Sequence, residues 1–274
     1  MRLANCSLLI STYNWPQALN LALKSALFQT RLPSEILLAD DGSKEETRQL
    51  IDRFKQISPV PIHHFWQEDI GFRKSQILNK ALAKCSSEYV IQIDGDCIMH
   101  PYFVQDHMAS AQKGVYLFGP RVDILPDHVA DVLANQQTEF NVYSKKIKNK
   151  TRNLHIPFIS NFYRPKKGFS DRFRGCNASF WYQDLLAING YNEDYEGWGR
   201  EDSDLVIRMG NGGVKAKRLK YAGIVYHIDH PINSRDRFDL NDKLHNDVIT
   251  KGTVRIANGM DKYLDGPGQP SPGA

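Results

Sequence analysis

Apolar and polar positions follow two alternating periods through the first hundred residues. Short continuous apolar runs are typical of strands buried in a parallel sheet, and apolar residues three or four positions apart are typical of amphipathic helices. The runs that predict strands are "CSLLI" (6–10), "EILLAD" (35–40), "PIHHFW" (61–66) and "YVIQI" (89–93), and the segments that predict helices lie between them at 16–29, 45–57 and 73–85. This order predicts an α/β fold in which helices cover both faces of a mostly parallel, Rossmann-like sheet.

A polar cluster follows each predicted strand. The clusters are "STYN", "DDGS", "QEDIGFRK" and "DGDCIMHP". Ligands of parallel α/β sheets bind beyond the carboxyl ends of the strands, so we expect the four clusters to meet at one binding site. Ser43, with Glu46 three residues later, also predicts an N-cap for the second helix.

After residue 100 the pattern weakens. It predicts helices over 102–113, 182–191 and 202–213 and a strand over 115–122, while the Pro/Gly-rich tail 265–274 is predicted to be disordered. The basic stretch 144–174 is either a solvated loop or a surface that meets an anionic acceptor or a lipid head group.

Composition excludes few functions, but it indicates where in the cell the protein is expected. The chain has 274 residues with a formal net charge of +4, which permits an anionic ligand without requiring one. A nucleic-acid binder is disfavoured because no predicted helix carries a continuous basic face. The four cysteines form no CxxC pair and no apolar run is long enough for a signal peptide or a membrane span. We therefore expect a cytoplasmic protein, with peripheral membrane contact left open.

Two acidic residues and a histidine are candidate metal ligands. Asp94 and Asp96 in "DGD" share one face of an extended segment, as suits a divalent cation. His227 follows the predicted strand "YAGIVY", and Asp229 and His230 come just after it in "YHIDH". An imidazole added to the carboxylates would favour Mn²⁺ over Mg²⁺.

Other residues are candidates for binding a nucleotide. Tyr13 offers a flat face for stacking, and Asp40 or Asp41 could accept a hydrogen bond from a base. A simple turn with a helix cap is the alternative for "DGS". The sequence contains neither a dinucleotide-binding GxGxxG nor a Walker loop, which disfavours hydride transfer and P-loop chemistry.

The stretch "GWGREDSDL" places adjacent acids behind a tryptophan set between two glycines. A carboxylate of Glu201 or Asp202 could serve as a general base. Alternatively, Asp202 caps the helix that follows and Glu201 pairs with Arg200.

These segments together resemble the family 2 glycosyltransferases with the GT-A fold. The resemblance runs from about residue 5 to about 265, and its second half is similar to a galactosyltransferase-type C-terminal segment found in bacterial chondroitin polymerase domains. The segments that carry it are "STYNWPQALNLALKSALFQT", "LLADDGS", "QEDIGFRKSQILNKAL", "IQIDGDC", "RGCNASFW" and "GWGREDSDL".

The resemblance implies a role for each candidate. On the donor side, Ser11, Tyr13 and Asp41 would hold the nucleoside (Asp40 being the other candidate), Arg73 or Lys74 would lie near the donor, Asp94 would reach the ribose or the metal, and Asp96 and His227 would bind Mn²⁺ or Mg²⁺. On the acceptor side, Trp198 would stack on a sugar, Arg200 would lie beside the acceptor, Asp202 would be the general base and Glu201 would bind sugar hydroxyls. Asn177 would lie beside the donor sugar or the acceptor.

The implied activity is a metal-dependent, inverting transfer from a nucleotide sugar, most often a UDP-sugar, to a glycan or a lipid-linked glycan in bacterial surface polysaccharide synthesis. Residues 1–100 would be the donor half and 101–264 the acceptor and catalytic half of one domain. Two alternatives stay open. A sugar nucleotidyltransferase would need a glycine-rich basic loop after the first strand, and a non-catalytic binding module would not need Glu201 and Asp202.

Overall fold

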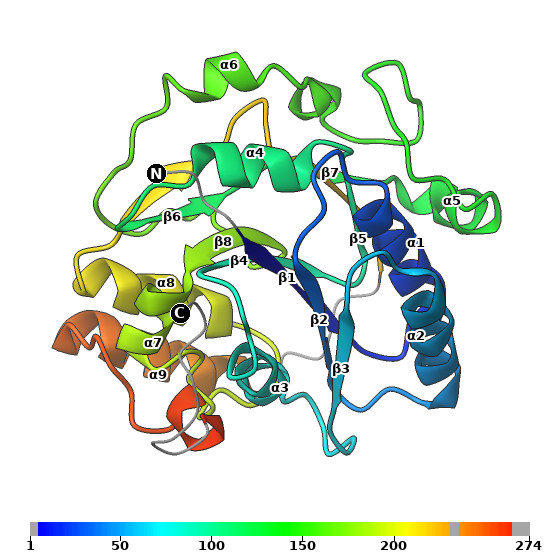
Figure 1. Cartoon of the computed structure of the whole chain (residues 1–274). Helices are drawn as coiled ribbons and strands as arrows, with labels where there is room; N and C mark the ends of the chain where they lie inside the picture. The colour runs from blue at the N-terminus through cyan, green and yellow to red at the C-terminus, as the bar shows by residue number, and fades with distance from the viewer. Residues whose placement is uncertain (1–4, 231–235, 265–274) are drawn as a thin grey trace.

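The computed structural model describes residues 5–230 and 236–264. Within them, a seven-stranded sheet has the order β3-β2-β1-β4-β8-β6-β9 (Figure 1). β8 is antiparallel to both of its neighbours and the other strands run in one direction, which confirms the mostly parallel sheet. The strands are β1 (Cys6–Thr12), β2 (Glu35–Asp40), β3 (Ile62–Trp66), β4 (Tyr89–Asp94), β6 (Val115–Phe118), β8 (Asn177–Trp181) and β9 (Lys215–Arg218).

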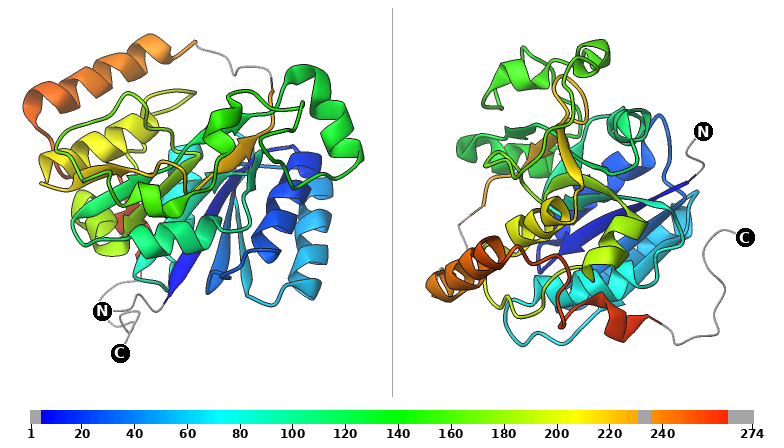
Figure 2. Two further views of the ribbon diagram at one scale, coloured as in Figure 1. Left: turned by 90° about the horizontal axis from the view of Figure 1, so that it is seen from above. Right: turned by 90° about the vertical axis from the view of Figure 1, so that its left-hand side faces the viewer.

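Helices cover both faces of this sheet, as Figure 2 shows. Alternation along β1 assigns the faces, because Leu8 and Ile10 belong to one apolar cluster and Leu9 belongs to the other. The first cluster includes α1 (Pro16–Leu27), α2 (Glu45–Ile57) and α4 (Phe103–Ser110), and the second includes α3 (Lys74–Leu82), α7 (Tyr182–Ile188) and α8 (Glu201–Asn211).

A second, three-stranded sheet has the order β5-β10-β7 and consists of β5 (Cys97–Met99), β10 (Val225–His227) and β7 (Arg121–Asp123). The predicted strand 115–122 is therefore two strands in different sheets, since Pro120 lacks the N–H that a continuous ladder needs. Register places His227 opposite Cys97, directly after Asp96. The second sheet thus carries the C-terminal half of the chain back to the end of β4.

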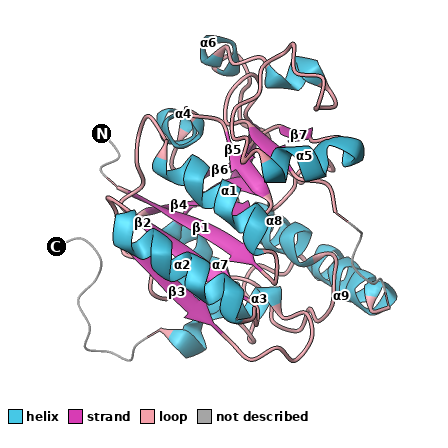
Figure 3. Cartoon of the chain, turned by 90° about the vertical axis from the view of Figure 1, so that its right-hand side faces the viewer, coloured by secondary structure: helices cyan, strands magenta, loops and turns pink. Residues whose placement is uncertain are grey.

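The remaining elements lie around these two sheets. They are η1 (Pro126–His128), α5 (Val129–Ala134), η2 (Lys150–Asn153), α6 (Pro157–Ser160), α9 (Phe238–Lys251) and η3 (Met260–Tyr263). The basic stretch 144–174 is mostly loop, and its α6 lies at the top of Figure 3, away from the central sheet. Sequence patterns predicted neither β8 nor α9. The predicted tail 265–274 lies outside the described residues. Among the described helices, none combines the length and apolar composition that a membrane span requires.

The predicted cap at Ser43 is wrong. α2 begins after Lys44, without a side-chain cap. The Ser43 hydroxyl instead accepts a hydrogen bond from the Asn14 N–H at 2.8 Å, and the Ser43 N–H donates to Asp40 at 2.8 Å. These bonds join the loops after β1 and β2 at the edge where the site forms.

Candidate functional site

A cavity of about 990 Å³ opens beyond the carboxyl ends of β1, β2 and β4. Each of the four predicted loop clusters lines it, so the expected meeting of the clusters at one edge is confirmed. Their lining residues include Ser11, Thr12 and Tyr13, then Asp41, then Asp69, Gly71, Phe72 and Lys74, then Asp94, Gly95 and Asp96. The C-terminal half contributes Arg121, Arg174, Gly175, Trp198, Glu201, Asp202 and His230, among others.

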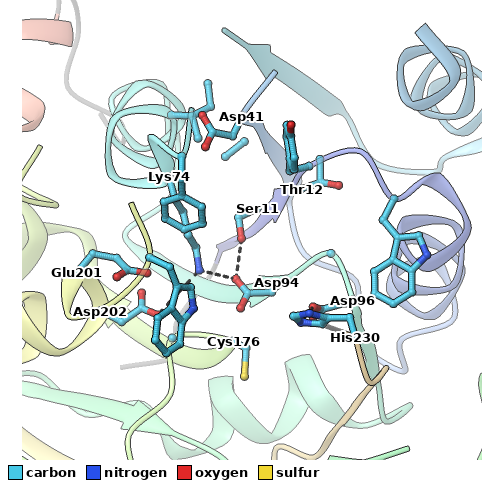
Figure 4. Close-up of a pocket in the computed structure, with 18 of the residues that line it drawn as sticks. Ser11, Thr12, Asp41, Lys74, Asp94, Asp96, Cys176, Glu201, Asp202 and His230 are labelled. Carbon is cyan, nitrogen blue, oxygen red and sulfur yellow. Dashed lines mark hydrogen bonds and ion pairs between the residues drawn. The ribbon is translucent and has the colours of Figure 1, made fainter. Parts of the chain in front are cut away.

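Asp94 lies at the centre of the cavity wall (Figure 4). Parallel pairing of β1 with β4 places Ser11 beside Asp94, and the Ser11 hydroxyl donates to the carboxylate at 2.6 Å. The ammonium of Lys74, the first residue of α3, donates to the same oxygen at 2.8 Å. Burial by itself would lower the pKa of Lys74, but the charges of Asp202, Asp94 and Glu201 outweigh it and raise that pKa well above its ordinary value.

Glu201 and Asp202 begin α8 and point into the cavity beside Lys74 (Figure 4). Glu201 accepts a bond from the Gly199 N–H at 3.0 Å. Burial, followed by the charge of Asp202, raises the pKa of Glu201 to about 7. Burial also raises the pKa of Asp202, although the ammonium of Lys74, 3.9 Å away, opposes that shift. Two acids of reduced acidity therefore face one lysine.

Gly175 makes room for Asp202. A Cβ at this position would lie 2.1 Å from an oxygen of the Asp202 carboxylate. The Tyr191 hydroxyl lies on the same carboxylate, 3.4 Å from its other oxygen. The glycine of "RGCN" is thus a packing requirement of the acid on α8.

The third acid of "REDSD" does not belong to the cavity. Asp204 is fully buried and pairs with the equally buried Arg208 at 2.7 Å. Arg208 also donates to the carbonyls of Ile188 and Gly190, both at 2.8 Å. This pair fixes α8 to the end of α7 and has a structural role.

Asp96, His227 and His230 form a group whose ligand atoms all lie within 4.8 Å of one another. Asp96 is 3.1 Å from the His230 Nε2 and 3.6 Å from the His227 Nε2. Burial alone would raise the pKa of Asp96, but the hydrogen bond from His230 and the charges of both imidazoles hold it below its ordinary value. Two imidazoles and one carboxylate are a donor set suited to a borderline divalent cation such as Mn²⁺.

Asp94 is not a member of that group, and His230 was not among the predicted ligands. The sequence offered both histidines of "YHIDH", but their spacing alone could not show that both reach Asp96. In Figure 4, Asp94 lies between the acids of α8 on one side and Asp96 with His230 on the other.

Asp41 and Tyr13 line the part of the cavity nearest β2. Asp41 accepts bonds from the Gln67 amide at 2.6 Å and the Arg73 N–H at 2.8 Å, and burial raises its pKa. Tyr13 leaves about half of its surface exposed (53%), with its hydroxyl donating to Asp69 at 2.9 Å.

Two predicted site residues, Asp40 and Asn177, are buried and are not among the described residues that line the cavity. Asp40 is fully buried; its carboxylate is bonded to the His64 ring at 2.9 Å and accepts the Ser43 N–H. Asn177 is also buried, and its amide donates to the carbonyls of Pro120 and Gly223. Both side chains use their polar atoms within the protein.

The guanidinium groups of Arg73 and Arg200 also lie outside the cavity lining. Arg73 donates to Gln76 at 3.1 Å, and only its backbone N–H reaches Asp41. Arg200 pairs with Asp242 and stacks over Phe238 at 5.2 Å. Lys74, the alternative to Arg73, does line the cavity, so a position of one of the two near the donor stays a prediction, as does the position of Arg200 beside the acceptor. Trp198 does line the cavity.

Comparison with known proteins agrees with the geometry. Glycosyl transferase family 2 matches residues 7–172, and the N-terminal domain of galactosyltransferase matches residues 157–231. A chondroitin synthase of Escherichia coli is 25% identical over 253 residues; the match covers 82% of this chain and 35% of the synthase, so the chain spans about a third of that relative's length.

Two solved structures share the fold. Residues 1–349 of S. aureus TarS in complex with UDP superpose with a TM-score of 0.60 at 15% identity, covering 95% of this chain and 70% of that one. A mannosyltransferase of Pyrobaculum calidifontis, in complex with GDP-Man and Mn²⁺, gives 0.58 at 17% identity, covering 88% and 61%. With the family 2 match spanning more than half of its length, the chain belongs to glycosyltransferase family 2 and has the GT-A fold.

Proposed function

We propose that this glycosyltransferase is metal-dependent and inverting, and that it moves a sugar from a UDP-sugar to a hydroxyl of a glycan or lipid-linked glycan. The observation that carries the proposal is the arrangement around Asp94. Within one cavity, the carboxylate of Asp202 lies on one side of Asp94 (Figure 4). Asp96 and His230 lie on the other side (Figure 4), and with His227 they form what we call the cation-binding group. An acceptor and a leaving diphosphate need these two groups on opposite sides of the transferred sugar.

The donor would occupy the half of the cavity built by residues 1–100. In this proposal Tyr13 stacks on the base, Asp41 accepts its N–H, and Ser11 with Asp94 holds the ribose. The structures of TarS with UDP and of the mannosyltransferase with GDP-Man support a nucleotide donor. Lys74 organises this half because it neutralises Asp94 from within the wall.

Asp96, His227 and His230 would hold the metal ion. When bound, a divalent cation neutralises charge on the leaving diphosphate. The mannosyltransferase solved with Mn²⁺ supports a metal in this fold. Because two of the three ligands are imidazoles, we propose Mn²⁺ rather than Mg²⁺.

The acceptor would enter through the half built by residues 101–264. An acceptor hydroxyl is a weak nucleophile, and Asp202 would take its proton as the oxygen attacks the anomeric carbon. Attack from the side opposite the diphosphate inverts the anomeric configuration. Lys74 favours the ionised form of Asp202, which a base requires. Glu201 would bind acceptor hydroxyls and Trp198 would stack on the sugar ring.

The relatives support the class of acceptor. The match to a chondroitin synthase supports a growing polysaccharide of a bacterial surface, and a lipid-linked form would be met at the membrane surface. The family match leaves no reason to keep the nucleotidyltransferase alternative.

A calorimetric titration with UDP, GDP and CMP, each with and without Mn²⁺, tests the donor and the metal together. We expect UDP to bind tightly only with Mn²⁺. Preferred binding of GDP would overturn the UDP assignment while keeping the mechanism, and no binding to any nucleotide would contradict the proposal. Analysis of the product anomer then tests inversion.

A further inference from the structure

A smaller cavity of about 370 Å³ adjoins the first. Gly119 and Pro120, which connect β6 to β7, form part of its wall, and the other lining residues are Arg121, Arg152, Arg172, Arg174 and Arg218. Arg121 and Arg174 line the large cavity as well, so the two cavities share a wall. We call this smaller cavity the arginine cavity.

These arginines come from segments that are far apart in the sequence. Phe173 is buried against Tyr116 and Phe118, with ring centroids 5.8 and 5.9 Å away, while its two neighbours Arg172 and Arg174 are exposed. Arg121 begins β7 and Arg218 ends β9. The fold, and not a local basic run, therefore concentrates the positive charge.

Little negative charge balances this cluster. Among the described residues, no carboxylate lines the arginine cavity. Arg121 has an acidic partner in Asp123 at 2.9 Å, whereas Arg152 and Arg174 donate to backbone carbonyls. The pKa of Arg218 is lowered by burial and then by the charges of Arg172 and Arg152. Guanidinium groups held together in this way match the oxygens of a carboxylate or a phosphate.

The arginine cavity borders the large cavity at two places. At Arg121 it adjoins the metal-ligand side, because Asp123, the ion-pair partner of Arg121, lies 3.9 Å from His227. At Arg174 it adjoins the side that holds Asp202. Arg174 directly precedes Gly175, the residue against which the Asp202 carboxylate packs. The donor diphosphate has its own cation-binding group at Asp96, His227 and His230. With the donor diphosphate assigned to that group, an anion in the arginine cavity is assigned to the other substrate, which presents a hydroxyl to Asp202.

We propose that the arginine cavity binds an anionic group, a carboxylate or a phosphate, carried by the acceptor, so that this enzyme extends an acidic glycan. The inference rests on the proposed function, since it assumes that Asp202 faces the acceptor. It adds the class of acceptor and five residues that recognise it.

The test measures binding of three oligosaccharides of equal length to the full chain saturated with UDP and Mn²⁺. One carries uronates, one carries phosphodiesters and one is neutral, so the first two distinguish the source of the anion. We expect one anionic oligosaccharide to bind at least about tenfold more tightly than the neutral one. The Arg172→Gln/Arg218→Gln variant should lose that preference while its UDP titration stays unchanged.

Lys145→Gln/Lys148→Gln is the matched control, because it removes the same charge from two exposed positions of the basic stretch 144–174 that do not line the cavity. Equal binding of anionic and neutral oligosaccharides, no binding of any, or equal losses in both variants would each overturn the proposal. Loss of UDP binding in the arginine variant alone would assign the cluster to the donor and overturn it too. If the unmodified chain binds no UDP but retains the arginine-dependent preference, the donor proposal fails and the anion site stands.

Discussion

At the scale of single residues, the site consists of charged side chains that contact one another. Ser11 and Lys74 hold Asp94, and Lys74 also faces Asp202. Burial makes each ionised carboxylate costly, and the one ammonium among them offsets part of that cost. The proton affinities of the acids are therefore set by their neighbours as much as by their type.

The first prediction concerns the base. Asp202→Asn keeps the shape of the side chain but cannot accept the acceptor proton, so we expect the transfer rate to fall at least about 100-fold. UDP binding should persist, because Asp202 lies on the far side of Asp94 from the cation-binding group. Transfer assays measure the expected fall in rate, and UDP titrations of the same preparation measure the binding that should persist. Full activity in the variant would sink the assignment.

The second prediction concerns pH. The pKa of Glu201 rises from 4.5 to about 7 in the folded protein, so the native state binds this proton more tightly than the unfolded chain does. Its contribution to stability is present below about pH 4.5 and is lost as the pH rises through about 7. Relative to wild type, Glu201→Gln should gain on the order of 3 kcal/mol of unfolding free energy across that window. Urea titrations of both proteins measure it, and a constant difference would contradict the assigned pKa.

At the scale of elements, α8 has two functions. Its first turn presents Glu201 and Asp202 to the cavity, and Asp204 of the same turn pairs with Arg208 of the last turn to attach the helix to the protein interior. The position of the two carboxylates thus depends on the buried ion pair of Asp204 with Arg208 and on the space that Gly175 leaves.

The third prediction tests that space. In Gly175→Ala the new methyl group would displace the Asp202 carboxylate, so we expect a lower transfer rate with unchanged UDP binding. Gly210→Ala, in α8 itself, is the control, because a Cβ there meets no heavy atom within 4 Å. That control should keep its activity and gain roughly 0.5–1 kcal/mol of stability. Equal rates in the two variants would show that the contact with Gly175 is unimportant.

The fourth prediction tests the ion pair. Arg208→Met would leave the Asp204 carboxylate buried without its partner and two carbonyls without their donor. We expect a loss of about 3–5 kcal/mol in the free energy of unfolding. Lys251→Met breaks a pair whose partners are 68% and 52% exposed and should cost less than about 1 kcal/mol. Chemical denaturation compares them; similar losses would argue against the anchoring role.

At the scale of the whole molecule, the cavity exists because two sheets meet. Strand β4 of the central sheet ends at Asp94. Pairing of β10 with β5 in the small sheet brings His227 and His230, more than a hundred residues later in the chain, close to Asp96. The same return brings Arg121 to the wall between the two cavities.

The fifth prediction follows from this assembly. His227→Ala and His230→Ala should each weaken Mn²⁺-dependent UDP binding, because each removes one of the three proposed ligands. His63→Ala, on the outer strand β3, is the control, since its side chain is half exposed. Titrations with increasing Mn²⁺ provide the comparison. If His230→Ala matches the control, the metal group is only Asp96 and His227.

The sequence by itself determined the α/β order, the mostly parallel sheet and the edge at which the polar loops gather, because hydrophobic period and strand direction are local properties. It did not separate Asp41 from Asp40, although the first lines the cavity and the second is buried. Neighbouring residues at a strand end point in different directions, and only packing shows which way is inward. Tertiary structure alone decided that Asn177 is a buried hydrogen-bonding residue, that His230 joins Asp96, and that five scattered arginines share one cavity. Those contacts join residues far apart in the chain, and their geometry depends on register and packing that no local pattern encodes.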